Sequence, residues 1–242
     1  MEHRERALLR RWIPVVALAE ILGFAVPAVV GVLTVGSPVV LSLPLLVAAG
    51  AVEGALLGTG QALVLRSALP AISVTRWVLA TAGAAALAYL LALLPSTTAT
   101  VTAAWPVPVL IVSAIALGLL VLLTIGVAQW SELRRHVDPA AAWIGITAVA
   151  WLLGLGIFLA VAMPLWHPGQ SVPVAVLVGL VAGALMALVM AAVTGAGLVV
   201  LLRRSRGRAT GRGTSGETFG PGVGGAEGGS SGAIPVRRGE RS

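Results

Sequence analysis

The stretch that decides the fold is GALLGTGQALVLR, residues Gly54 to Arg66. It is apolar apart from one glutamine, Gln61, and its small residues come first. Small residues in an apolar segment are typical of helices that pack closely in a lipid bilayer. An arginine directly after such a segment is typical of the point where a helix leaves the membrane on the cytoplasmic side. We therefore interpret the stretch as the cytoplasmic end of a transmembrane helix.

The composition of the whole chain also indicates a membrane protein. Of its 242 residues, 58% are hydrophobic and only 10% are charged, whereas soluble domains carry about 25% charged residues. The absence of cysteine excludes disulfides and thiolate metal sites. The basic residues are all arginine, a bias typical of a bacterial protein of high-GC origin. They lie beside apolar spans, so we attribute the net charge of +7 to membrane topology rather than to nucleic-acid binding.

Six apolar spans predict an all-α polytopic membrane protein with six transmembrane helices. The spans cover residues 12–35, 39–65, 77–94, 107–130, 140–163 and 174–202, each to within a few residues. We expect a cytoplasmic segment at 1–11, a transmembrane domain at 12–203, and an uncharged threonine-rich loop at 95–108. The Gly/Ser/Arg-rich tail at 204–242 has too few large apolar side chains to offset the entropy of ordering, so it is predicted to be disordered.

The arginines predict the orientation of the chain. They lie at the N-terminus and after the second, fourth and sixth spans, and the other three loops contain neither lysine nor arginine. The positive-inside rule therefore places both termini in the cytoplasm, in a chain that spans the cell membrane. Tryptophans near the span ends are expected at the membrane interfaces, Trp151 inside the fifth span being the exception. The cytoplasmic group consists of Trp12, Trp77, Trp130 and Trp143, and the outer group of Trp105 and Trp166.

The ending of the second span recurs later in the chain. The pattern G-x-x-Q-x-x-x-L-R runs from Gly58 to Arg66 and again, 68 residues on, from Gly126 to Arg134. A third copy from Gly195 to Arg203 has Leu198 in place of the glutamine. The chain is therefore predicted to contain three parallel two-helix repeats, at about 12–66, 77–134 and 143–203. Each repeat begins at a tryptophan. The alternative is that abundant Gly and Leu, together with the positive-inside rule, produce the pattern without duplication.

This ending, followed by a short loop and a tryptophan that opens the next helix, resembles uncharacterised multi-pass membrane proteins of cyanobacteria, Chloroflexi and actinobacteria. In those proteins the glutamine is usually followed by tryptophan, as in Gln129–Trp130, whereas Ala62 follows Gln61 here. The resemblance covers the second to fifth spans and implies a membrane location without a known activity. The layout of three helix pairs is also that of mitochondrial carriers, but the Pro-x-acidic-x-x-basic signature of carriers is absent from the odd spans.

Glu20 and Glu53 are the ionisable residues well inside the apolar spans. A charge at the middle of a bilayer costs about 2.5–3.5 kcal/mol on insertion scales, so each carboxyl must stay protonated or face a partner or a wet cavity. A tight turn at Gly36–Pro38 makes the first two spans antiparallel neighbours, so the two carboxyls can face a shared interior. Both are candidates for a proton or cation site. The alternative is a pair of hydrogen-bonded carboxyls that fixes helix packing.

Two further groups of residues are candidates for contacts between helices. Gln61 and Gln129 form a candidate polar layer near the cytoplasmic end, which either lines a vestibule or, the interpretation we favour, hydrogen-bonds between helices. Gly50, Gly54 and Gly58 form two overlapping G-x-x-x-G motifs on the second span. These motifs predict close packing against another helix, in this chain or in a second copy.

The sequence predicts no catalytic, cofactor or metal site. It contains no G-x-S-x-G, H-E-x-x-H or P-loop motif. Its three histidines, His3, His136 and His167, are expected on different sides of the membrane and cannot share a metal ion. We therefore expect a non-enzymatic membrane protein that passes or transports a small solute or ion, or alternatively a scaffold or complex subunit. The expected partners are the lipid bilayer, anionic inner-leaflet lipid at the arginine-rich segments, and a second copy of the chain, but not nucleic acid.

Overall fold

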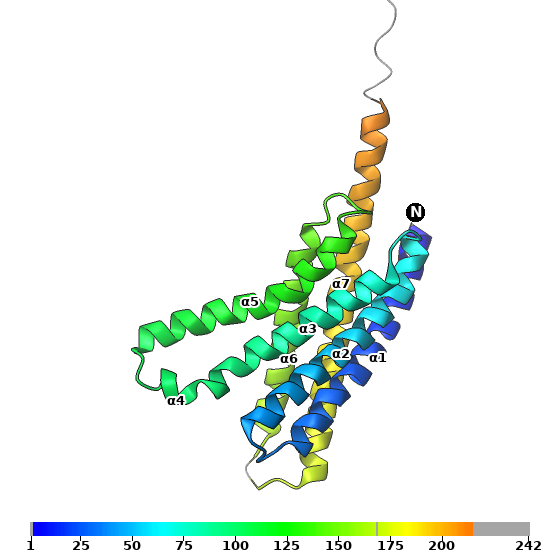
Figure 1. The fold of residues 1–242 in the computed structure, drawn as a ribbon. Helices are drawn as coiled ribbons and strands as arrows, with labels where there is room; N and C mark the ends of the chain where they lie inside the picture. The colour runs from blue at the N-terminus through cyan, green and yellow to red at the C-terminus, as the bar shows by residue number, and fades with distance from the viewer. Residues whose placement is uncertain (1, 168, 215–242) are drawn as a thin grey trace, which may run out of the picture.

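The structure, a computed structural model, describes residues 2–167 and 169–214. In these ranges the chain is helical, without strands. Six of the helices are long and apolar enough to cross a membrane, and α4 is a single short turn between two of them. The chain is thus an all-α, multi-pass membrane protein (Figure 1). Its helices are α1 (Glu2–Leu33), α2 (Val39–Ala68), α3 (Val74–Thr97), α4 (Ala99–Thr102), α5 (Val107–Leu133), α6 (Ala142–Leu165) and α7 (Val172–Thr214).

All the long helices except α6 are longer than the apolar spans that predict them. α1 begins at Glu2 and so includes the predicted N-terminal segment, and α7 continues past the predicted boundary at Leu202 to Thr214. The predicted loop at 95–108 instead holds the end of α3, all of α4 and the start of α5. Hydropathy detects where a helix stops being apolar, whereas backbone hydrogen bonding continues into the arginine-rich ends, because arginine is a good helix former. The remainder of the predicted disordered tail, 215–242, lies outside the described residues.

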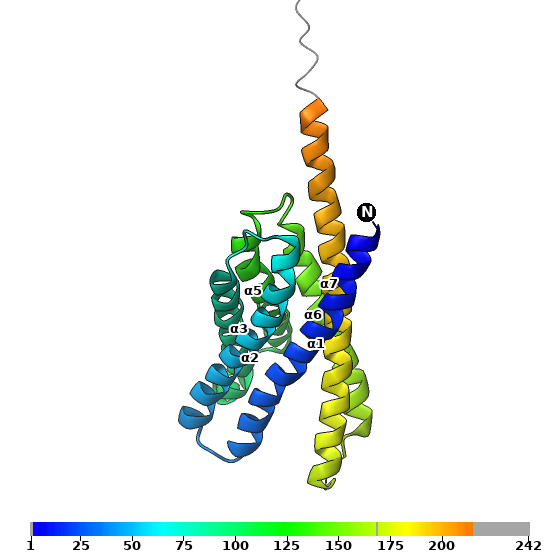
Figure 2. The same ribbon diagram turned by 90° about the vertical axis from the view of Figure 1, so that its right-hand side faces the viewer.

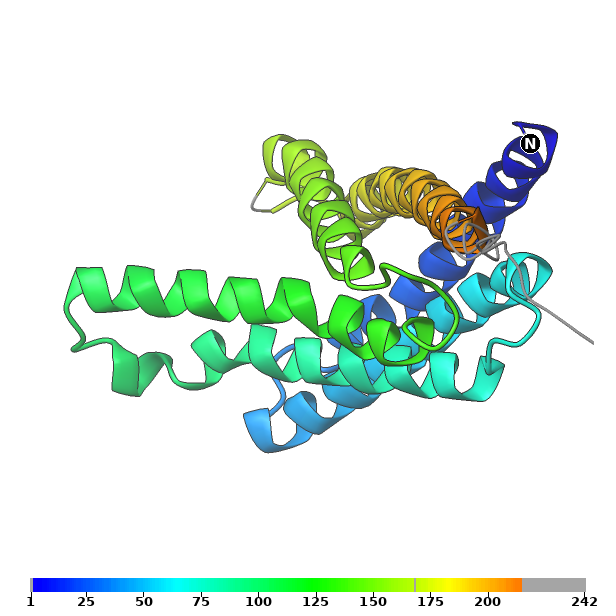
Figure 3. The same cartoon turned by 90° about the horizontal axis from the view of Figure 1, so that it is seen from above.

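The six long helices form a closed ring in chain order. Each contacts the next, with the short α4 between α3 and α5, and α7 returns to contact α1; Figure 3 shows the ring from above. An ion pair between Glu5 of α1 and Arg203 of α7 joins the first and last helices. Both described chain ends, together with the α2–α3 and α5–α6 loops, lie at one end of the bundle, which we call the terminal end (Figure 1). The opposite end is called the far end.

The three helix pairs converge at the terminal end and diverge toward the far end. The pairs are α1–α2, α3–α5 and α6–α7, and Figures 1 and 2 show their separation from two directions. Burial follows the same gradient. The buried residues of α5 lie between Ile125 and Leu133, near its C-terminal end, and those of α3 lie between Trp77 and Ala85, near its start. The packed core of the protein therefore occupies the terminal end.

Three tryptophans lie in this core and not on its outer surface. Trp12, Trp77 and Trp143 have no exposed surface. The ring centroids of Trp12 and Trp143 are 6.3 Å apart, and those of Trp77 and Trp143 are 6.1 Å apart. The predicted location at the depth of the membrane interface stays a prediction, but these three do not face lipid, because closure of the ring turns one tryptophan of each pair inward, where its indole N–H finds a partner. Trp130 remains partly exposed and lies 4.9 Å from the guanidinium of Arg134.

The glycine motifs of α2 pack against α3 of the same chain. A Cβ atom at Gly54 would lie 2.5 Å from the Cβ of Ala85 and 2.7 Å from a backbone oxygen of α3. A Cβ atom at Gly50 would lie 2.3 Å from the ring of Tyr89, and one at Gly58 would lie 3.0 Å from the side chain of Thr81. The partner that the G-x-x-x-G motifs predict is therefore α3.

Candidate functional site

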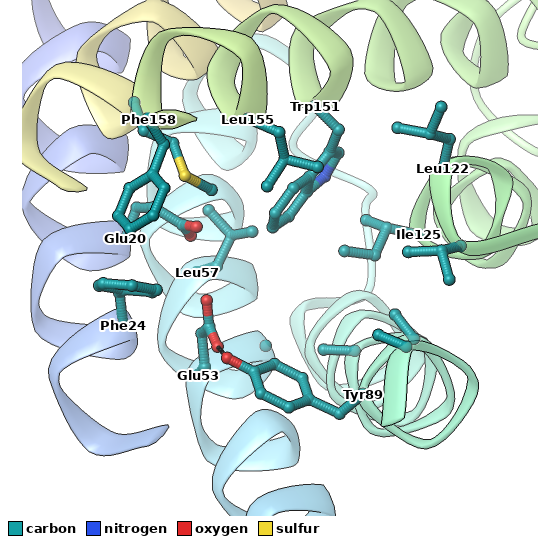
Figure 4. A pocket seen from close by; sticks show the side chains of 16 residues that line it. Glu20, Phe24, Glu53, Leu57, Tyr89, Leu122, Ile125, Trp151, Leu155 and Phe158 are labelled. Carbon is teal, nitrogen blue, oxygen red and sulfur yellow. Dashed lines mark hydrogen bonds between the residues drawn. The ribbon is translucent and has the colours of Figure 1, made fainter. Parts of the chain in front are cut away.

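A cavity of about 290 Å³ lies at the centre of the helix ring. All six long helices contribute side chains to its wall, which Figure 4 shows from close by. Its size is near the lower end of the range of about 300–1,000 Å³ that is usual for small-molecule sites. Apart from the indole N–H of Trp151, the side chains on the wall that carry polar atoms are Glu20, Glu53 and Tyr89.

The two carboxyl groups come from facing helices. Glu20 of α1 and Glu53 of α2 have exposed fractions of only 2% and 5%. α1 approaches α2 closely at this level, since a Cβ atom at Gly23 would lie 3.1 Å from the backbone oxygen of Glu53. The structure thus brings together the two intramembrane glutamates that the sequence singles out, and it places both on one cavity. Their functional role stays a prediction.

The two carboxyls differ in their partners. The hydroxyl of Tyr89 on α3 donates a hydrogen bond of 2.6 Å to Oε2 of Glu53. Both carboxyl oxygens of Glu20 are buried without a hydrogen-bond partner. A buried polar group that lacks its hydrogen bond costs about 1–3 kcal/mol, and a charged one costs more. Glu20 is therefore the group on the wall that gains most from a proton, a water molecule or a cation in the cavity.

Sequence reasoning did not single out Tyr89. A signal was present, because Tyr89 is the single tyrosine of the chain and lies inside an apolar span, and a buried phenol usually finds a hydrogen-bond partner. The identity of that partner depends on which helices are neighbours, and Glu53 lies on the preceding helix. The ring topology was needed to pair the two residues.

The rest of the wall is apolar and aromatic. α5 contributes only aliphatic side chains, α6 contributes Trp151, Leu155 and Phe158, and α7 contributes Met186. The rings of Phe24 and Phe158 meet edge to face, with centroids 5.8 Å apart. No basic side chain belongs to the described residues on the wall, so neither carboxyl has a countercharge there.

A hydrogen-bonded layer separates the cavity from the terminal end. The side-chain nitrogen of Gln129 donates to Oε1 of Gln61 at 2.7 Å and to the hydroxyl of Thr81 at 3.0 Å. The indole of Trp77 donates to Oε1 of Gln61 at 3.2 Å, and the indole of Trp143 donates to Oε1 of Gln129 at 2.8 Å. We call these five residues the Gln–Trp layer. Its members are buried, so the two glutamines bond between helices and do not line an open vestibule.

The same contact recurs around the ring. Trp77 opens the second helix pair and donates to α2 of the first pair, while Trp143 opens the third pair and donates to α5 of the second. Trp12 opens the first pair and donates to Thr194 of α7, in the third pair, at 3.1 Å. The acceptor is Thr194 because the position that corresponds to the glutamines holds Leu198, one turn further along α7. The three pairs therefore make equivalent contacts around the ring, which supports the predicted repeat.

The cavity lies on the far-end side of the Gln–Trp layer. On α2, Leu57 and Glu53 lie successively further from the terminal end than Gln61, and on α3 Tyr89 lies further than Thr81. Beyond the cavity the helix pairs diverge (Figure 2). The contact between α5 and α6 is the least extensive between neighbours in the ring, and residues 107–120 of α5 are exposed on nearly every side. The described structure thus places the buried Gln–Trp layer between the cavity and the terminal end.

No group of three or more His, Cys, Asp or Glu side chains that could hold a metal ion occurs in the part of the chain that the structure describes. No protein-family model, curated protein or solved structure gives a significant match to this chain. The resemblance to bacterial multi-pass proteins therefore stays a prediction, and the function is argued from the cavity.

Proposed function

We propose that the protein transports a small solute or ion across the membrane through the central cavity, with Glu20 and Glu53 as the groups that bind the solute or exchange protons with it. One observation carries the proposal: two buried carboxyls, one of them without a partner, face a single cavity built by all six spanning helices. Ionisable residues inside a membrane are costly and usually mark ion or substrate pathways. Helix packing alone would favour apolar side chains at these positions.

The geometry supports an alternating-access mechanism. The Gln–Trp layer lies between the cavity and the terminal end, and we propose that the cavity opens toward the far end. Transport then requires this layer to separate while the far ends of the helix pairs approach each other, which is a rocking motion of repeats around a fixed site. Hydrogen bonds between membrane helices contribute on average ~0.6 kcal/mol each, and water can replace them. The hydrogen bonds of the layer therefore oppose its opening only weakly.

The alternative function, a non-catalytic scaffold or complex subunit, is favoured by one observation. Residues 107–120 of α5 protrude from the bundle with apolar side chains exposed on nearly every side. A partner helix would bury this surface. The cavity plays no part in that function, so replacement of its carboxyls separates the two hypotheses.

The test is a solute screen in liposomes that contain the purified protein and a pH-sensitive dye in their lumen. Candidate solutes of different charge are added one at a time, and the movement of protons and the uptake of the solute are both recorded. We expect at least one solute to drive proton movement with the wild type and none to do so with Glu53→Gln. Glu217→Gln, which makes the same chemical change in the tail, is the matched control and should behave as the wild type. Folded wild-type protein that moves neither protons nor any solute of the panel would contradict the proposal.

A further inference from the structure

We infer that the solute bound in the cavity is a monovalent organic cation with an apolar body, such as a protonated lipophilic amine or a phosphonium ion. The inference rests on the proposed function and deepens it by naming the substrate class. Its three arguments concern the charge of the wall, the chemistry of the wall and the route of access.

The charge of the wall selects a cation. Glu20 and Glu53 are the side chains on the wall that can carry a charge near neutral pH, and no basic side chain lies beside them there. An anion would meet two carboxyls, either of which repels it when ionised. Because one oxygen of Glu53 already accepts from Tyr89, the two free oxygens of Glu20 are the best placed to pair with an incoming positive charge.

The chemistry of the wall favours an organic cation over a metal ion. Calcium takes about six to eight oxygen ligands, and magnesium needs about six in near-octahedral geometry. The described wall offers only two carboxyls and one phenol among apolar side chains. Four of its residues are aromatic, namely Phe24, Tyr89, Trp151 and Phe158. Aromatic faces attract organic cations within about 6 Å, and apolar walls bury the carbon atoms of the ligand.

The route of access favours a molecule that partitions into lipid. The buried residues of α5 lie near its C-terminal end, whereas residues 107–120 are exposed. The contact of α5 with α6 is the least extensive in the ring. Where α5 and α6 meet at the cavity, the side chains that they contribute include the aliphatic Leu122 and Leu155 (Figure 4). A molecule that reaches the cavity between these two helices passes aliphatic side chains, which favours an apolar cation over a strongly hydrated ion.

The cation and a proton compete for the same carboxyls. Pairing of Glu20 with the cation requires its ionised form, so binding to the protonated carboxyl releases one proton. The titratable groups that face Glu20 across the cavity are Glu53 of α2 and Tyr89 of α3, and the described wall residues of α5, α6 and α7 include no others. Exchange of one cation for one proton links solute movement to a proton gradient without net movement of charge.

The test measures binding of tetraphenylphosphonium to the purified full-length protein in a non-ionic detergent, by equilibrium dialysis. Tetraphenylborate, which has nearly the same shape and the opposite charge, is the matched probe. We expect saturable tetraphenylphosphonium binding, on the order of tenfold or more tighter than that of tetraphenylborate, with proton release that a pH dye detects. Glu20→Gln should weaken phosphonium binding by on the order of tenfold or more, and Glu217→Gln should leave it unchanged.

Equal affinity for the two probes, or phosphonium binding unchanged by combined Glu20→Gln and Glu53→Gln substitution, would overturn the inference. If the glutamine variants do not fold, Leu155→Trp provides a second test, because it fills the cavity without changing a carboxyl. Loss of phosphonium binding in this variant supports the inference, and unchanged binding overturns it. Dialysis does not depend on transport. Binding without flux in liposomes would refute the proposed function alone, and flux of another solute without phosphonium binding would refute the substrate class alone.

Discussion

Thr81 and Thr147 occupy equivalent places in the second and third helix pairs, but only one of them has hydrogen-bond partners. Each lies one turn after the tryptophan that opens its helix. The hydroxyl of Thr81 accepts from Gln129 at 3.0 Å and donates to the backbone oxygen of Trp77 at 2.8 Å. The hydroxyl of Thr147 is buried without a partner. The repeat explains the difference, because the residue that corresponds to Gln129 in the third pair is Leu198, which cannot donate.

The same substitution should therefore have different effects at the two sites. Thr81→Val leaves one N–H of Gln129 without an acceptor, which costs about 1–3 kcal/mol. Measured hydrogen bonds between membrane helices average ~0.6 kcal/mol with a maximum of ~1.7, so we expect a loss of ~1–2 kcal/mol in the free energy of unfolding. Thr147→Val keeps the side-chain shape and removes an unpaired hydroxyl, so its effect should be neutral or stabilising.

The assay is unfolding in mixed micelles with increasing SDS, followed by circular dichroism. Thr59→Val is the reference for the intrinsic effect of the substitution, because Thr59 is exposed and bonds only within α2. The expected order of stability is Thr147→Val, equal to or above the wild type, then Thr59→Val, then Thr81→Val. Equal destabilisation by Thr81→Val and Thr147→Val would refute the hydrogen-bond assignment, and with it the physical basis of the repeat.

Three further predictions concern helix packing, the terminal end and the cavity. Gly54→Ala should destabilise the protein by about 1–3 kcal/mol, because its Cβ would lie 2.5 Å from that of Ala85, whereas Gly83→Ala has open space and should be neutral or stabilising; equal SDS midpoints would contradict this. Glu132 is buried and accepts hydrogen bonds from Arg76 at 2.7 Å and from the backbone nitrogen of Ser73 at 2.9 Å. Glu132→Gln should therefore lower the free energy of unfolding by about 1–3 kcal/mol in the same assay. An unchanged SDS midpoint would show that these contacts do not stabilise the protein. Tetraphenylphosphonium binding should strengthen as the pH rises, since protonation removes the charge of the carboxyls, and an affinity independent of pH would mean that no carboxyl pairs with it.

The sequence predicted the six helices, and its arginines agree with the common end of the two described chain ends, because hydrophobic length and arginine position are local properties of the chain. It could not predict that Trp12 is buried, because a tryptophan near an arginine fits an interfacial belt until the contact of α1 with α7 is known. The short turn after α1 was enough to predict that Glu20 and Glu53 lie on neighbouring helices. The hydrogen bond between Glu53 and Tyr89 could not be predicted, because it depends on how α2 packs against α3.

The absence of cysteine from the chain allows the central claim to be tested with a single introduced thiol. Ala88 of α3 lies on the cavity wall beside Tyr89, and Ser67 lies exposed at the end of α2, at the terminal end. The Ala88→Cys protein in oriented liposomes is treated with a membrane-impermeant maleimide from one side or the other, with and without tetraphenylphosphonium. Ser67→Cys is the control for a thiol that is accessible from the terminal side.

The account predicts that Ala88→Cys reacts only from the far side and that the phosphonium ion slows the reaction. It also predicts that this protection is lost when Glu20→Gln is added, while Ser67→Cys reacts only from the terminal side. Reaction of Ala88→Cys from the terminal side, or a rate that the phosphonium ion does not change, would contradict a carboxyl-lined cation site that is open toward the far end.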